Sequence, residues 1–186
     1  MPPAFVPPPL DTPRLCVRPV EAQDLQDLLA VNGDTDVTRF LPYPAWTSLA
    51  DGHAWHERMA ALEAAGSAWQ LVVVDKASNA VIGTCLLFRF EATSGRAELG
   101  YVLGRAHWGR GYMAEALGAV IGCAFGAAGL RRLEAEVNPI NTASTRLLHK
   151  LGFTQEGVLR QRWVARGEPY DVALFGLLSH EWPRTP

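Results

Sequence analysis

The chain has 186 residues, a formal net charge of -2 and 48% hydrophobic against 19% charged residues. Because domains typically hold about 100 to 200 residues, this length predicts a single domain. The composition excludes a disordered or collagen-like chain. The near balance of charges gives no electrostatic basis for binding nucleic acid or an anionic membrane, so we expect neither partner.

The cysteines and the N-terminus bear on the compartment and on the domain boundary. Three cysteines with no C-x-x-C pair signal neither a disulfide framework nor a zinc site, so we expect a reducing cytoplasm and no metal. Residues 1–13 hold six of the 13 prolines and no export signal. We expect them to form an extended lead-in outside the fold, with the domain at 14–182.

The periodicity of apolar residues predicts the elements of the first half of the chain. Apolar and polar residues alternate at the first strand, and leucines recur at helical spacing directly after it. A turn-rich, aromatic loop then leads to a second helix that begins with a capping box at Ser48 and Asp51. The predicted ranges are a strand at 14–20, a helix at 22–31, a loop at 33–47 and a helix at 48–65.

The second half begins with apolar, β-branched runs separated by short turns, which predict three sequential antiparallel strands at the centre of the sheet. A long helix, a strand, a helix ended by Gly152 and a final hairpin follow. The predicted ranges are strands at 68–75, 80–91 and 96–103, a helix at 111–128, a strand at 132–137, a helix at 142–151, and strands near 157–164 and 170–178. This order predicts an α+β fold with a mixed, mostly antiparallel sheet.

The uncharged run Ala116 to Leu130 lies in the long helix. As a helix it would rise about 22 Å, less than the roughly 30 Å of a hydrocarbon core. We therefore expect it to pack inside the protein, with Gly118, Gly122 and Gly126 allowing close contact.

Glycines separate the end of a predicted strand from the long helix in the segment 104–114, Gly-Arg-Ala-His-Trp-Gly-Arg-Gly-Tyr-Met-Ala. Unpaired backbone N–H groups and the positive end of a helix dipole bind phosphate, and glycines allow close approach. Arg105 and Arg110 add positive charge. The segment matches neither a Walker loop nor a Rossmann fingerprint. Considered alone, it is equally well explained as a glycine turn entering a helix.

A second polar segment, Asn138-Pro-Ile-Asn-Thr-Ala-Ser144, opens the next helix. Asn141 is placed to cap that helix, and Ser144 falls in its first turn. Considered alone, the segment indicates simple helix capping.

Together, the two segments resemble the GNAT N-acetyltransferase superfamily, and most closely its ribosomal-protein N-terminal acetyltransferase branch. The resemblance runs from about Leu10 to Trp182 and implies a single-domain GNAT-like fold with about four helices. The matching motifs are Trp108-Gly-Arg-Gly-Tyr112 with Glu115-Ala116, Asn141-x-x-Ser144 with Lys150-Leu-Gly-Phe153, Ala97-Glu-Leu-Gly-Tyr101, Asp36-Val-Thr-Arg-Phe-Leu41 and Tyr170-Asp-Val-Ala-Leu-Phe-Gly-Leu-Leu178.

The resemblance implies acetyl-CoA as cosubstrate and Glu98 and Ser144 as catalytic residues. Leu148 stands where many members have a tyrosine acid, so Ser144 is the acid that the branch implies. The strand at 132–137 is expected to splay away from its neighbour to make room for pantetheine. The implied cosubstrate-binding residues are Tyr101, Val102, Leu103, Trp108, Gly109, Arg110, Gly111, Tyr112, Met113, Ala114, Asn138 and Asn141.

Acyl transfer to an amine requires a neutral amine, a polarised carbonyl and a stabilised thiolate. Glu98 is either the base or a solvated carboxylate at a strand end. No cysteine or serine stands in a nucleophile–base arrangement, so we expect direct attack on the thioester. The acceptor is a protein N-terminus or a small-molecule amine, and a CoA-binding sensor without activity is the rival interpretation. The chain is expected to be a monomer or a homodimer.

Side chains from the aromatic loop and the second helix are candidates for the acceptor groove. Phe40, Tyr43, Trp46 and Trp55 either line this groove or pack in the core. His53 and His56 either border the acceptor or lie on the surface of the helix.

Overall fold

The computed structural model describes residues 7–165 and 167–183, and its strands form one mixed sheet with the order β1-β2-β3-β4-β5-β6-β8-β7. Only β5 and β6 run parallel to each other among these neighbours. The strands are β1 (Leu10–Asp11), β2 (Leu15–Pro19), β3 (Ala68–Asp75), β4 (Ala80–Glu91), β5 (Arg96–Leu103), β6 (Arg132–Val137), β7 (Thr154–Ala165) and β8 (Glu168–Leu178).

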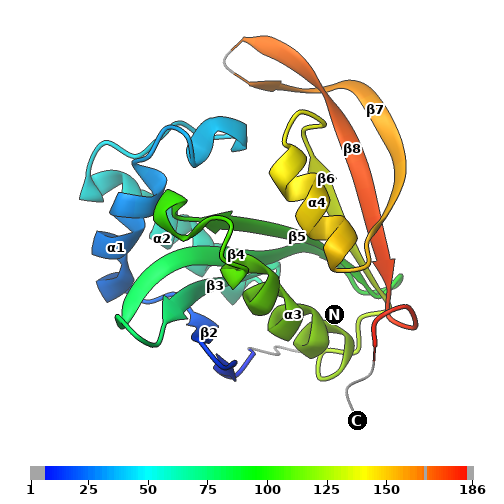
Figure 1. The fold of residues 1–186 in the computed structure, drawn as a ribbon, viewed down its shortest axis with the longest axis horizontal. Coiled ribbons are helices and arrows are strands. Elements are labelled where there is room, and N and C mark those ends of the chain that lie inside the picture. The colour runs from blue at the N-terminus through cyan, green and yellow to red at the C-terminus, as the bar shows by residue number, and fades with distance from the viewer. Residues whose placement is uncertain (1–6, 166, 184–186) are drawn as a thin grey trace.

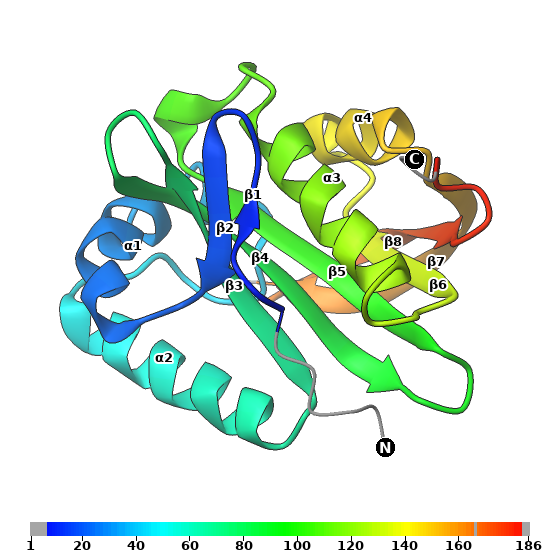
Figure 2. The ribbon, with the colours of Figure 1, turned by 90° about the horizontal axis from the view of Figure 1, so that it is seen from below.

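Helices cover both faces of this sheet, as Figure 2 shows. One apolar cluster joins α1 (Leu25–Asn32) and α2 (Leu49–Ala64) to β2, β3 and β4. A larger cluster on the opposite face packs α3 (Tyr112–Phe125) and α4 (Thr142–Lys150) against the sheet. The two faces are called here the α1/α2 face and the α3/α4 face.

The predicted α+β architecture is confirmed, including three sequential antiparallel strands β3, β4 and β5. The long helix is shorter than predicted, because α3 ends at Phe125 and Gly126 caps it. Glycine has low helix propensity, so the small residues that follow do not extend the helix.

The final hairpin is longer than predicted and projects beyond the rest of the sheet (Figure 1). Most residues of β7 are exposed, so the strand lacks the alternating pattern that marks a half-buried strand. Its pairing with β8 is also interrupted between Leu159 and Trp163, where Gln161 has a φ of 49°.

The segment before residue 14 departs from the expectation of a lead-in outside the fold. Residues 1–6 lie outside the described part of the chain. Leu10 and Asp11 pair with Val17 and Cys16 of β2, and Thr12 bonds to Glu115 of α3. Proline has no N–H to donate to a neighbouring strand, but a strand at the edge of a sheet tolerates this loss. A proline-rich composition therefore does not exclude a short edge strand.

The strands β5 and β6 diverge at the centre of the sheet. They pair only through Arg96–Glu98 and Arg132–Glu134, and beyond Glu98 the edge of β5 that faces β6 has no strand partner in the described structure. The expected splaying is therefore confirmed. The unpaired stretch at 99–103 runs toward the glycine loop at the start of α3.

Candidate active site

The glycine loop before α3 has the geometry of an anion site. Gly109 and Gly111 have φ angles of 72° and 79°, a left-handed conformation that glycine adopts without strain. Gly111 is the N-cap of α3, and the N–H groups in the first turn of a helix have no partner within the helix. The turn therefore presents N–H donors and the positive end of the dipole to solvent.

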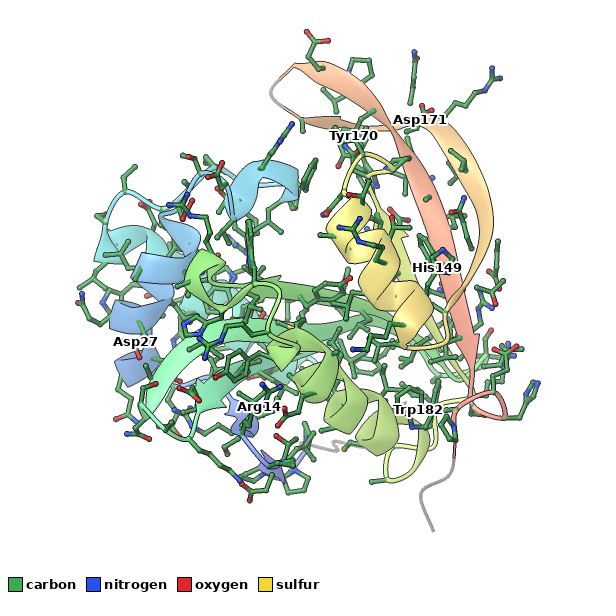
Figure 3. The ribbon with its side chains drawn as sticks, viewed as in Figure 1. Arg14, Asp27, His149, Tyr170, Asp171 and Trp182 are labelled. Carbon is green, nitrogen blue, oxygen red and sulfur yellow. The ribbon has the colours of Figure 1, made fainter. Side chains whose placement is uncertain are left out.

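The side chain of Arg14 holds this loop in place and lies beside the start of α3 (Figure 3). Its Nη1 donates to the Arg110 carbonyl at 3.0 Å, and its Nε donates to Glu115 at 2.7 Å. The guanidinium also stacks on the ring of Tyr112, with 4.4 Å to the ring centroid. Sequence reasoning missed Arg14, because nothing in its local pattern reveals a contact about a hundred residues away.

Backbone groups of β5 point into the gap between β5 and β6 at alternate residues. Gly104 N–H donates to Ile82, so even-numbered residues of β5 bond to β4, and odd-numbered residues direct their backbone groups toward the gap. Tyr101, one of the implied cosubstrate-binding residues, therefore has free backbone groups at this edge. Val102 does not, because its backbone faces β4 and its side chain is buried.

Two further residues define the ends of this free edge. Leu99, which sequence reasoning did not single out, is the first odd-numbered residue beyond the pairing with β6. Its period-2 position relative to Tyr101 is the signal that could have found it. At the other end, the Leu103 carbonyl accepts a hydrogen bond from Trp108 Nε1 at 2.7 Å. The indole of Trp108 thus closes the free edge.

The start of α4 lies on the α3/α4 face of this gap. Asn141 caps the helix as predicted, because its Oδ1 accepts from Ser144 N–H at 3.2 Å. The hydroxyl oxygens of Ser144 and Tyr101 are 2.5 Å apart, and either group is able to donate. Burial raises the pKa of Tyr101 to about 12, so the phenol stays protonated at neutral pH.

The carboxylate of Glu98 lies on the opposite, α1/α2 face of β5, because its neighbours Ala97 and Leu99 pack in the core beneath α3. It is mostly buried, and Arg89 Nη1 donates to it at 2.8 Å. Burial raises the pKa of Glu98 above its usual value, and the charge of Arg89 acts against this rise.

A cleft of about 350 Å³ opens beside Glu98. Its charged residues are paired across the walls, with Arg96 on Glu134 at 2.7 Å and Arg132 on Glu156 at 2.5 Å. The charged side chains that line the cleft are four arginines and four glutamates: Arg89, Arg96, Arg132, Arg162, Glu98, Glu134, Glu136 and Glu156. The cleft therefore carries no net charge from these groups.

The remaining predicted loop residues take different places. Met113 is buried, with its Sδ 3.9 Å from Cys85 Sγ, so only its backbone faces the loop. Ala114 lies in the first turn of α3. Asn138 forms a turn after β6, where its Oδ1 accepts from Ile140 N–H at 3.2 Å and its carbonyl accepts from Asn141 N–H.

The candidate acceptor residues divide between the core and the surface. Trp46 and Trp55 are buried against each other, with ring centroids 5.5 Å apart, so for them the core alternative holds. Phe40 and Tyr43 are both partly exposed. The buried part of the Tyr43 side chain includes the surroundings of its hydroxyl, and this burial raises the pKa of Tyr43 to about 12. His53 is exposed on α2. The side chain of His56 is half-buried.

Two kinds of functional feature are absent from residues 7–165 and 167–183. No group of three or more His, Cys, Asp or Glu side chains in this part of the chain is arranged to hold a metal ion. None of the helices described there has the length and apolar character needed to cross a membrane.

The sequence and the fold match known proteins along most of the chain. Residues 14–154 match the family model described as "Acetyltransferase (GNAT) domain". An uncharacterized N-acetyltransferase, p20 of Bacillus licheniformis, is 36% identical over 93% of this chain and 97% of its own length. The [ribosomal protein uS5]-alanine N-acetyltransferase of Escherichia coli is 30% identical over 93% of this chain and 92% of its own length.

A solved structure confirms the fold independently. Mycobacterium smegmatis RimJ, in complex with CoA-disulfide, superposes with a TM-score of 0.87 at 22% identity, over all of this chain and 93% of that one. The family model therefore shows that the protein is an acetyltransferase, and the solved structure shows that it has the same fold. It belongs to the GNAT family and is an N-acetyltransferase.

Proposed function

We propose that the protein transfers the acetyl group of acetyl-CoA to the α-amine of a protein N-terminus, by direct attack in a ternary complex. One observation carries the proposal: the free edge of β5 lies between Glu98 on one face of the sheet and the Ser144–Tyr101 hydroxyl pair on the other. An amine arriving from the cleft and a thiol leaving toward α4 would meet at this edge.

The residues at the edge fit the parts of acetyl-CoA. The N–H groups of the loop at 109–114 suit its pyrophosphate, because they offer donors at the positive end of a helix dipole. The free backbone groups of Leu99 and Tyr101 suit the amides of pantetheine, which would pair like an added strand. An N–H at the same edge is able to polarise the thioester oxygen.

The transfer balances with the groups present. The amine nitrogen forms a bond to the acetyl carbon while the carbon–sulfur bond breaks and its electron pair leaves with the sulfur. The amine proton passes to the Glu98 carboxylate, directly or through water. The Ser144 hydroxyl donates a hydrogen bond to the departing thiolate, which then takes a proton from solvent. This assigns the base to Glu98 and the sulfur donor to Ser144.

The cleft favours a peptide over a polyamine. A polyamine carries several positive charges and would be drawn to a site with excess carboxylates. Each of the four glutamates that line this cleft has an arginine partner. The cleft therefore offers no such attraction to a polyamine. An α-amine also needs little help from a base, because its pKa of about 7.8 leaves a substantial neutral fraction at pH 7. The likeness to the E. coli uS5-alanine N-acetyltransferase supports the same acceptor class.

The experiment incubates the purified chain with acetyl-CoA and three kinds of acceptor: short peptides with free N-termini, spermidine and an amino sugar. Released thiol is followed with time, and products are identified by mass spectrometry. Thiol release that depends on the peptides supports the proposal. Turnover with spermidine or the amino sugar alone would make the protein a small-molecule acetyltransferase. Binding of acetyl-CoA without release with any acceptor would favour the CoA sensor.

A further inference from the structure

The position that many family members use for a tyrosine acid is filled here by Leu148, which is fully buried in the core. No hydroxyl comes from that position. A phenol nevertheless reaches the start of α4 from another element, because Tyr101 of β5 places its hydroxyl 2.5 Å from Ser144 Oγ. The two residues are 43 positions apart, and the contact exists only in the folded chain.

We infer that Tyr101 is a positioning residue that turns the Ser144 hydroxyl toward the sulfur of CoA. The inference rests on the proposed function for the identity of the leaving group. The direction of the hydrogen bond follows from the chemistry of the two groups. A phenol is far more acidic than an aliphatic hydroxyl and is therefore the better donor, whereas the serine oxygen is the better acceptor.

A hydrogen bond donated by Tyr101 leaves the hydroxyl proton of Ser144 available to another acceptor. The backbone N–H of Ser144 is held by Asn141 Oδ1 at 3.2 Å, which fixes the first turn of α4. With the Tyr101 hydroxyl donating to Ser144 Oγ, the serine hydroxyl hydrogen is free to point into the gap beside β5. A thiolate in this place would receive that hydrogen bond together with the field of the α4 N-terminus.

Tyr101 does not give up its proton in this arrangement. Its pKa is raised to about 12 by burial, well above the value of about 8.5 for an ordinary thiol. Proton transfer to the thiolate would therefore be unfavourable, and the pair acts by hydrogen bonding alone. Because the bond to sulfur strengthens as charge develops, its loss should affect turnover more than substrate binding.

The first test compares Tyr101→Phe, Ser144→Ala and the double variant, with Thr145→Ala as control. Thr145 is the next residue of α4, and its side chain is rotated by about 100° around the helix. We expect each single variant at 101 or 144 to lower kcat roughly 10-fold to 100-fold, with the KM for acetyl-CoA changed less than about threefold. The double variant should lose little more than the worse single variant, because both remove one interaction. Thr145→Ala should behave as wild type.

The second test does not require turnover and separates the inference from the proposed function. The affinity of CoA and of an analogue without the sulfur atom is measured by calorimetry from pH 6 to 9. In the wild type, CoA should gain affinity over the analogue as the thiol ionises, and Tyr101→Phe should reduce this gain about tenfold or more.

The outcomes of the two tests are distinct. In one outcome no amine is acetylated, but the affinity of CoA relative to the analogue still rises with pH and this rise depends on Tyr101. The proposed function would then be wrong, and the role of Tyr101 and Ser144 as a hydrogen-bonded pair would be supported. If amines are acetylated and Tyr101→Phe matches wild type in kcat and in CoA affinity at every pH, the inference is overturned. Melting temperatures of all variants within a few degrees of wild type show that the fold is intact.

Discussion

Arg89 and Glu98 form an ion pair at 2.8 Å. It joins the bulge of β4 to the last residue of β5 that pairs with β6. Arg89 has a φ of 52°, a left-handed conformation that is unfavourable for a residue with a side chain. Its guanidinium also lies 4.0 Å from Glu136 and above the ring of Trp163. The pair thus links the proposed base to the projecting β7–β8 hairpin.

Replacing Arg89 by Gln should shift the acidic limb of the kcat/KM profile to higher pH. Burial raises the pKa of Glu98 and Arg89 lowers it, so removal of the positive charge raises this pKa further. The base is active only when ionised, and the variant should therefore lose activity at a higher pH than the wild type. Kinetics from pH 5 to 9 measure the shift.

The matched control is Arg131→Gln, because Arg131 bonds to the Ser94 carbonyl and does not line the cleft. Its profile should coincide with that of the wild type. An acidic limb left in place by Arg89→Gln would mean that the pair does not set the ionisation of Glu98.

Replacing Glu98 by Gln should reduce kcat/KM most strongly at low pH. An α-amine with a pKa near 7.8 deprotonates by itself as the pH rises, so the need for a base declines. We expect a loss on the order of 100-fold at pH 6.5 that becomes several-fold smaller at pH 9. A loss of the same size at every pH from 6 to 9 would show that Glu98 positions the acceptor and does not take its proton.

Replacing Gly111 by Asp should weaken acetyl-CoA binding at least tenfold. The change adds a negative charge at the N-terminus of α3 and a side chain where φ is 79°. Gly66→Asp is the control, because Gly66 has a φ of 66° and open space around it, away from the loop. Calorimetry should detect the loss only in the first variant. Equal affinity for both variants would remove the loop from the binding site.

Replacing Glu115 by Gln should destabilise the protein by about 1 to 2 kcal/mol near pH 7. Burial alone would raise the pKa of Glu115, but hydrogen bonds from Thr12 and Arg14 outweigh it and the pKa is lowered. The stabilisation is present above the unfolded pKa of about 4.3 and is lost as the pH falls through the lower folded value.

Urea unfolding of the wild type and of Glu115→Gln at pH 7 and at pH 3.5 measures this difference. The gap in the free energy of unfolding should narrow at the lower pH. Glu57→Gln changes an exposed glutamate of α2 and should leave the stability within about 0.5 kcal/mol of wild type. A gap for Glu115→Gln that is unchanged between the two pH values would exclude the ionised carboxylate as its source.

Local patterns were enough to predict much of the fold and part of the site. The glycines of the loop and the cap at Asn141 depend on backbone conformations set by a few neighbouring residues, and both are confirmed as structural features. Apolar periodicity predicts most of the strands and helices in their succession along the chain. The exposed strand β7 lacks that period, and its bounds were therefore predicted less well.

Contacts between distant elements could not be predicted from the sequence. Arg89 is paired with Glu98 because a bulge turns it toward β5, and nothing in the local sequence marks that bulge. The resemblance implies that Tyr101 binds the cosubstrate, but it gives no sign that the Tyr101 hydroxyl contacts Ser144 across the gap. The choice between groove and core for Trp46 and Trp55 depended on how α2 packs, which local composition does not determine.

A peptide that carries both an α-amine and a lysine amine shows which of the two the protein acetylates at the free edge of β5. A peptide with a free N-terminus and one internal lysine is incubated with acetyl-CoA and the protein at pH 7, and tandem mass spectrometry locates the acetyl group. At this pH a lysine amine pays about 4.6 kcal/mol for its neutral form and an α-amine only about 1 kcal/mol. We expect acetylation of the α-nitrogen, with one thiol released per acetyl group. Acetylation of the lysine alone would show that the proposed acceptor class is wrong.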